Sequence, residues 1–117
     1  MGVQENLSKI KSEIDSISKQ CGREGKVKLV AVSKFHLASS VLEAAEAGQI
    51  LFGENRVQEA SEKFDEVAKK FPAARLHIIG HLQRNKVKEA VRIASCIQSV
   101  DRAEIIDEIE RLTDELE

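Results

Sequence analysis

Apolar positions along the 117-residue chain change their spacing several times, and each spacing predicts a different element. From residue 3 to residue 20 they recur every three or four residues, which predicts one face of a helix. That stripe consists of Val3, Leu7, Ile10, Ile14 and Ile17. We expect Gly22 to end this helix. The next apolar run, at about 28–33, is continuous, which is typical of a parallel strand covered on both faces.

Strand-like and helical segments alternate through the rest of the chain. The further expected strands cover about 49–52, 76–79 and 95–99, and the further expected helices cover about 39–47, 56–71, 85–94 and 101–117. Ser39 or Ser40 is expected to cap the first of these helices, and Gly48 to end it. Pro72 limits the second, because proline disfavours helix in the residue before it.

The order of elements is therefore α-β-α-β-α-β-α-β-α, within one α/β domain covering residues 1–117. Strict alternation predicts parallel strands joined by right-handed crossovers. Four such strands fit either an open sheet or half of a TIM (β/α)₈ barrel, and a complete barrel needs about 250 residues. The chain has about half of that length and stops after a fourth strand and helix, which favours the half-barrel.

Composition narrows the class of protein. A net charge of −2 with interspersed signs, no basic block and no Trp or Tyr gives no sign of nucleic-acid binding. No apolar run approaches membrane-spanning length and no signal segment opens the chain, so we expect a cytoplasmic protein. Cys21 and Cys96 lie too far apart for a C-x-x-C motif, which argues against a disulfide or zinc site. We expect Cys96 to be buried and Cys21 to be exposed in a turn.

Lys34 closes the first expected strand. In α/β proteins ligands bind at the carboxyl ends of parallel strands, so Lys34 presents an amine where a ligand is expected. A lysine amine forms Schiff bases with aldehydes, and a partly desolvated site lowers its pKa so that it can attack a carbonyl. The alternative is a solvated lysine just beyond a strand.

The second expected strand ends in Gly53, Glu54 and Asn55. The Asn55 amide has both a donor and an acceptor, so it can hold a phenolic or pyridine oxygen without adding charge. Spacing alone favours a different role for Asn55, as the cap of the helix that begins near Arg56. Glu54 is available for a basic neighbour, but a single carboxylate is weak evidence for acid–base chemistry.

The third expected strand brings two histidines and a basic run. His77 falls near the start of the strand, so a buried, hydrogen-bonded core histidine is its default interpretation. His81 falls at the ligand end of the strand. Its position fits a ligand contact and an ordinary loop histidine equally well. Residues 83–86 fit either an anion site or a solvated start of a helix. Gly80 separates the histidines, which argues against a helical two-histidine metal site.

Four segments of the sequence, taken in order, closely resemble the pyridoxal phosphate homeostasis protein family. They are Leu29–Lys34, Phe52–Glu59, His77–Lys86 and Ile97–Asp101. The match runs in order from the first helix to the end of the chain. The resemblance implies the fold of the alanine racemase N-terminal domain, a (β/α)₈ barrel, of which this chain would be the N-terminal half.

The resemblance also implies roles for residues. Lys34 matches the lysine that holds pyridoxal 5′-phosphate (PLP) as an internal aldimine, Asn55 matches an asparagine near the cofactor ring, and His77 matches a position lining the barrel interior. The implied function is to bind and buffer PLP in vitamin B6 homeostasis, without catalytic residues or metal. PLP-dependent apoenzymes are the implied partners.

One departure from the family concerns the cofactor phosphate. The family holds it in loops after late strands, and this sequence stops before any such strand. A half-barrel also leaves strand edges and helix faces uncovered, so we expect a homo-oligomer in which two halves close together.

Two other functions stay open. One is a racemase-like, PLP-dependent enzyme acting on amino acids, which needs an acid or base on each face of the substrate carbon. The sequence has no tyrosine for that role, and Cys96 is the only thiol remotely placed for it. The other is a truncated domain that no longer binds cofactor.

Overall fold

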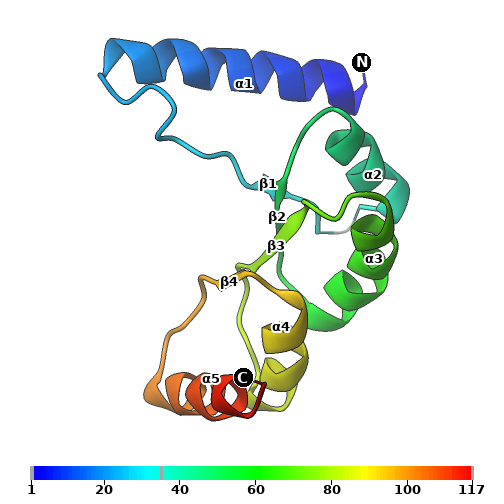
Figure 1. Cartoon of the computed structure of the whole chain (residues 1–117), viewed down its shortest axis with the longest axis vertical. Coiled ribbons are helices and arrows are strands. Elements are labelled where there is room, and N and C mark those ends of the chain that lie inside the picture. The colour runs from blue at the N-terminus through cyan, green and yellow to red at the C-terminus, as the bar shows by residue number, and fades with distance from the viewer. Residues whose placement is uncertain (1, 35, 117) are drawn as a thin grey trace.

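The chain folds as alternating helices and strands (Figure 1). The structure is a computed structural model that describes residues 2–34 and 36–116. The elements are α1 (Val3–Gln20), β1 (Ala31–Val32), α2 (Ala38–Glu46), β2 (Leu51–Glu54), α3 (Val57–Lys70), β3 (Arg75–Ile78), the 3₁₀ turn η1 (Arg84–Lys86), α4 (Val87–Ile93), β4 (Cys96–Ile97) and α5 (Ala103–Leu116).

The four strands form one parallel sheet in the order β1-β2-β3-β4. In its register Val32 lies beside Gly53, Gly53 beside His77, and His77 beside Cys96. Each strand follows its neighbour in sequence, so every connection is a βα crossover to the adjacent position. The predicted parallel α/β fold is therefore confirmed.

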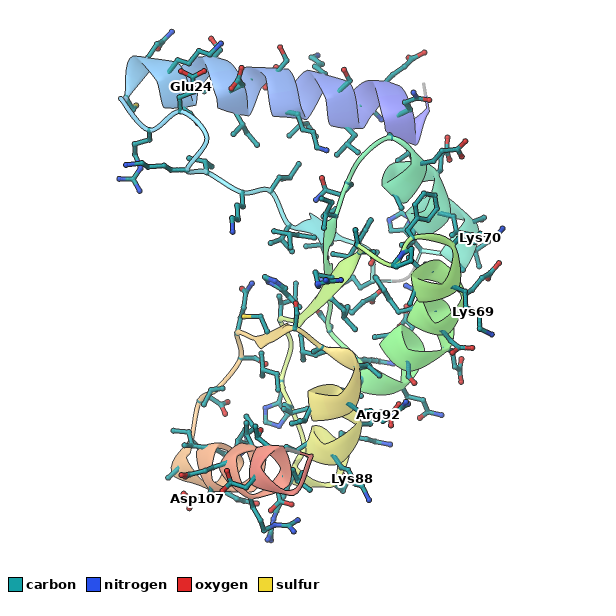
Figure 2. The ribbon with its side chains drawn as sticks, viewed as in Figure 1. Glu24, Lys69, Lys70, Lys88, Arg92 and Asp107 are labelled. Atoms are coloured by element: carbon teal, nitrogen blue, oxygen red, sulfur yellow. The ribbon has the colours of Figure 1, made fainter. Side chains whose placement is uncertain are left out.

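The core lies on one side of this sheet. Phe52, Leu76 and Ile78 point to that side and are almost fully buried. Helices α2, α3 and α4 cover them, as Figure 1 shows. The ring of Phe64 on α3 packs edge-on against that of Phe52, with centroids 5.6 Å apart. The outer sides of α3 and α4 carry charged groups such as Lys69 and Arg92 (Figure 2).

The opposite side of the sheet is covered by none of the described helices. It carries the registered residues Val32, Gly53, His77 and Cys96, and we refer to it as the open face. Val32 is 49% exposed and Cys96 is exposed as well. Two predictions are therefore wrong. The first strand is not covered on both faces, and Cys96 is not buried, because it lies beside His77 on the open face.

The helix boundaries follow the predictions closely, with one exception. Helix α1 spans the predicted residues and Gly22 follows it with φ +70°, as expected. Helix α2 begins after Leu37, whose side chain makes no capping hydrogen bond, so the predicted Ser39 or Ser40 cap is wrong. Leu7 on α1 is buried, but Ile17 on the same apolar stripe is 60% exposed.

No helix in residues 2–34 and 36–116 combines the length and apolar character that crossing a bilayer requires.

Because the core is one-sided, we expect burial on the helix side to dominate stability. Ile78→Ala should lower the free energy of unfolding by about 2–5 kcal/mol, since Ile78 is fully buried. Ile17→Ala, a change of the same size at an exposed position, should stay within about 0.5 kcal/mol. Urea unfolding followed by circular dichroism measures both. Equal losses in the two variants would contradict the one-sided core.

Candidate functional site

The carboxyl ends of the strands bring together the polar residues singled out in the sequence. Parallel strands end at the same edge of a sheet, and β1 and β2 pair up to Val32 and Gly53. Lys34 lies two residues after the end of β1, and Asn55 directly follows β2. Lys34 is exposed and Asn55 is half-buried. The expectation of a partly dry Lys34 amine is therefore not met in this chain alone.

Beneath this edge, on the helix side, lies a buried ionic cluster of Ser33, Glu54 and Lys63. The Ser33 hydroxyl donates to Glu54 Oε1 at 2.7 Å, and Lys63 Nζ donates to the same oxygen at 2.6 Å. Glu54 has no exposed surface. Its second oxygen, Oε2, is also buried and has no hydrogen-bond partner within the described chain.

Lys63 also reaches two further acceptors. Its Nζ donates to the Ser33 carbonyl oxygen at 2.7 Å and to Glu59 Oε1 at 3.2 Å. An ammonium group has three protons, so these contacts together with Glu54 use all of them. One side chain of α3 therefore joins the end of β1, the end of β2 and its own first turn.

A glycine allows the loop after β3 to contact Asn55. A Cβ placed on Gly80 would lie 2.7 Å from both the Cα and the carbonyl oxygen of Asn55, closer than real Cβ atoms approach. The neighbouring Ile79 N–H donates to the Glu54 carbonyl at 3.0 Å. The segment after β3 therefore constrains the position of Asn55.

His77 lies on the open face, where it contacts Gln98 at the end of β4. The His77 Nδ1 and Gln98 Nε2 atoms are 2.8 Å apart, and the Gln98 N–H donates to the Ile78 carbonyl at 2.9 Å. His77 is half-buried and is the third of four residues of β3. It thus lies nearer the ligand end than predicted, and it is hydrogen-bonded but not part of the helix-side core.

The loop after β4 pairs with His81. The Nδ1 atom of exposed His81 lies 3.7 Å from Asp101 Oδ2. A hydrogen bond from Arg102 is the main reason that the pKa of the Asp101 carboxyl is lowered from its ordinary value. Arg84 lies 3.6 Å from Glu108 of α5, which supports the solvated-helix interpretation of residues 83–86.

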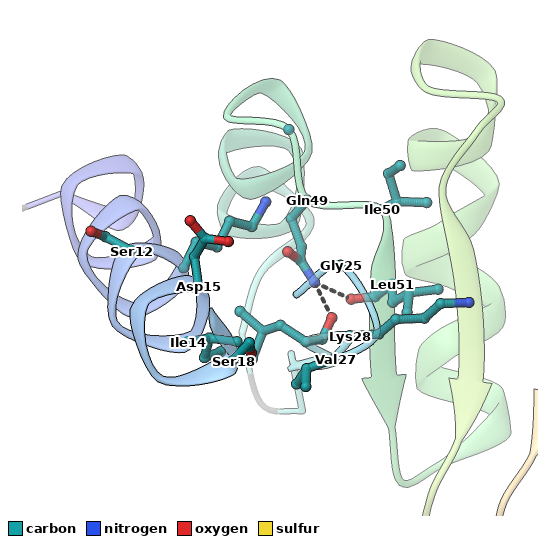
Figure 3. Close-up of a pocket in the computed structure, with 13 residues that line it drawn as sticks. Ser12, Ile14, Asp15, Ser18, Gly25, Val27, Lys28, Gln49, Ile50 and Leu51 are labelled. Carbon is teal, nitrogen blue, oxygen red and sulfur yellow. Dashed lines mark hydrogen bonds between the residues drawn. The ribbon is translucent and has the colours of Figure 1, made fainter. Parts of the chain in front are cut away.

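A further hollow lies elsewhere on the described chain. It is an open groove of about 730 Å³ between α1 and the segments that enter β1 and β2 (Figure 3). Gln49 Nε2 donates to the carbonyls of Leu29 and Leu51 at 2.7 Å each, which ties these segments together. The groove is at the amino ends of the strands, so it is separate from the Lys34 edge. No group of three potential metal ligands occurs among the described residues.

Sequence reasoning did not identify Ser33, Lys63 or Gln98 as site residues. The sequence could have indicated a role for Lys63, because this lysine interrupts the apolar stripe of α3 that continues with Phe64 and Val67. A lysine on a buried stripe needs a carboxylate nearby, and Glu54 was available. Ser33 and Gln98 left no such signal, since their contacts depend on strand register.

The fold and the strand-end cluster define a parallel α/β protein with a candidate ligand site at the carboxyl ends of its strands. No protein-family model matches the chain. Curated relatives do match it, and all three compared below are named pyridoxal phosphate homeostasis protein. The Vibrio cholerae protein is 39% identical over 106 residues, covering 88% of this chain and 45% of the relative. The Haemophilus influenzae protein is 39% identical over 110 residues, covering 93% of this chain and 46% of the relative. The Escherichia coli K12 protein is 36% identical over 104 residues, covering 86% of this chain and 44% of the relative.

Solved structures agree with the sequence comparison. PipY of Synechococcus elongatus PCC7942, solved with PLP bound, superposes with a TM-score of 0.85 at 38% identity, over 97% of this chain and 49% of PipY. An unknown protein from Bifidobacterium adolescentis gives a TM-score of 0.89 at 26% identity, over 97% of this chain and 50% of that protein. This chain is therefore a homologue of the pyridoxal phosphate homeostasis proteins, and it spans about half the length of the curated relatives it matches.

The contact at Gly80 gives a test of how Asn55 is held. Gly80→Ala should displace the Asn55 backbone and cost about 1–3 kcal/mol, as overpacking does. Gly53→Ala is the matched control, because the atoms nearest to its Cβ would be the ends of the Val30 and Ile79 side chains, at 3.1 Å, rather than backbone. Amide chemical shifts and urea unfolding report both effects. Unshifted Asn55 resonances in Gly80→Ala would show that this contact does not position it.

Proposed function

We propose that this chain binds pyridoxal 5′-phosphate at the carboxyl ends of β1–β3 and takes part in PLP homeostasis without catalysing a reaction. The observation that carries the proposal is the meeting of Lys34 and Asn55 at one sheet edge above a buried ionic cluster. Homology to proteins named for PLP homeostasis, and to PipY, which was solved with PLP, supports PLP as the ligand.

Lys34 is the proposed anchor. Its neutral amine attacks the PLP aldehyde carbon, the carbonyl oxygen leaves as water, and a C=N double bond joins Nζ to that carbon as a Schiff base. Bound in this way, the aldehyde is no longer free to react with other amines. A cytoplasmic location and delivery of PLP to apoenzymes complete the proposal.

The residues around Lys34 suit the cofactor ring. The Asn55 amide provides a donor and an acceptor for the ring oxygen. His77, held by Gln98, and Val32 lie on the open face near the same edge. We assign no phosphate ligand among the described residues, and the family resemblance implies that this group is held by the other half of a complete barrel.

The anchor is tested by adding PLP to the purified chain and recording the absorbance of the Schiff base. We expect a saturable band in the wild type and its loss in Lys34→Ala. Lys28→Ala is the control, because Lys28 is an exposed lysine that precedes the same strand. Borohydride reduction followed by peptide mapping should place the adduct on Lys34. A band that survives Lys34→Ala would refute the anchor, and turnover of an amino-acid panel would favour the racemase-like enzyme.

We also propose that the sheet is half of a TIM barrel and that a second copy of the chain closes it. The outer edges of β1 and β4 have no strand partner within the described residues. Val32 on the open face, Ile17 on α1 and Ile106 on α5 are exposed apolar side chains. Head-to-tail closure would bring residues 101–117, with eight acidic and two basic groups, towards residues 9–28, with six basic and three acidic groups.

If a second copy of the chain closes the barrel, sedimentation velocity should show a dimer whose fraction rises with protein concentration. Val32→Asp should return the chain to a monomer, because it puts a charge on the open face where the second copy would dock. Ala68→Asp, at an exposed position on the outer side of α3, should leave the dimer intact. A wild type that stays monomeric at all concentrations would overturn the dimer.

A further inference from the structure

Lys63 is an unusual residue for its position on α3. It is 7% exposed and lies on the helix side of the sheet, among the side chains that form the core. By contrast, Lys69 on the same helix points outward, as Figure 2 shows, and has a side chain that is 76% exposed. Burying an ammonium group is unfavourable unless it is paired. The presence of a lysine at this buried position therefore needs an explanation other than packing.

Stability alone is a weak reason for such a pair. Replacing both members of a buried ion pair with neutral, well-packed side chains is often neutral or stabilising, whereas removing one member leaves a buried charge unpaired. The pair is also incompletely satisfied, because Glu54 Oε2 is buried and has no hydrogen-bond partner among residues 2–34 and 36–116. A core built only for stability would use apolar residues here.

The contacts of Lys63 instead fix the relative position of two strand ends. Its bond to the Ser33 carbonyl fixes the residue just before Lys34, and its bond to Glu54 fixes the residue just before Asn55. The Ser33 hydroxyl joins the same Glu54 oxygen. β1 is only two residues long, so few ladder hydrogen bonds hold its end in place.

We infer that Lys63 is a positioning residue for PLP binding, which acts through Ser33 and Glu54 to hold Lys34 and Asn55 in the geometry the cofactor needs. This inference rests on the proposed function. A displacement of about 1 Å in a binding constellation is enough to lose most of its effect. The inference assigns no contact between Lys63 and the cofactor.

The test uses the double variant Glu54→Gln/Lys63→Met, which removes both charges of the buried Glu54–Lys63 pair and keeps an oxygen for the Ser33 hydroxyl. Lys69→Met is the matched control on the same helix. We expect the double variant to keep its circular dichroism spectrum and to bind PLP at least tenfold more weakly than the wild type. Borohydride trapping should no longer select Lys34, and in the PLP-free protein the Lys34 and Asn55 amide resonances should shift.

A double variant with PLP affinity within twofold of the wild type, trapping at Lys34 and unshifted amides would overturn the inference. If the double variant fails to fold, the PLP affinity of Ser33→Ala tests the inference instead. This variant removes the hydrogen bond from the Ser33 hydroxyl to Glu54 and keeps the Glu54–Lys63 ion pair. A threefold or larger loss of affinity supports positioning, and an unchanged affinity refutes it. A wild type that does not bind PLP would refute the proposed function instead, while the amide shifts would still report on positioning.

Discussion

The buried contact between Lys63 and Glu54 is the interaction on which the candidate site depends. Removing one member of such a pair costs about 3–5 kcal/mol, because the other charge stays buried. The cluster joins α3 to the ends of β1 and β2, so it belongs to the core and to the site at once. Lys34 follows Ser33 and Asn55 follows Glu54, so in our inference the separation of Lys34 and Asn55 is set from the helix side of the sheet.

The two sides of the sheet have different roles. The helix side holds Phe52, Ile78 and the ionic cluster, and it provides the stability of the chain. The open face holds Val32, His77 and Cys96, which are at least partly accessible. This exposure removes one argument against an enzyme, since burial of the Cys96 thiol had counted against catalysis.

The sequence predicted the order of the elements and the bounds of the helices well because local signals determine them. The strands β1 and β4 are shorter than expected, with two residues each. The apolar stripe of α1, the turn at Gly22 and the βα alternation are readable without tertiary contacts. Lys34 was proposed as a site residue because it ends an apolar run. The link from Ser33 to Lys63 spans thirty residues and the contact of His77 with Gln98 spans twenty-one, so both depend on strand register that no local pattern encodes. Burial of Cys96 was predicted wrongly for a related reason, since a continuous apolar strand does not reveal whether its second face is covered.

The proposed dimer and the proposed cofactor site are thermodynamically linked. Lys34 is exposed in the single chain, and a second copy seated on the open face would remove it and Val32 from water. Desolvation favours the neutral amine, the form that attacks an aldehyde. If closure thereby raises the affinity for PLP, then PLP must strengthen closure by the same factor, because the coupling of two binding equilibria is reciprocal. PLP would then act as the ligand that assembles its own site, and the buffering capacity of the protein would depend on the concentration of the chain as well as on that of the vitamer.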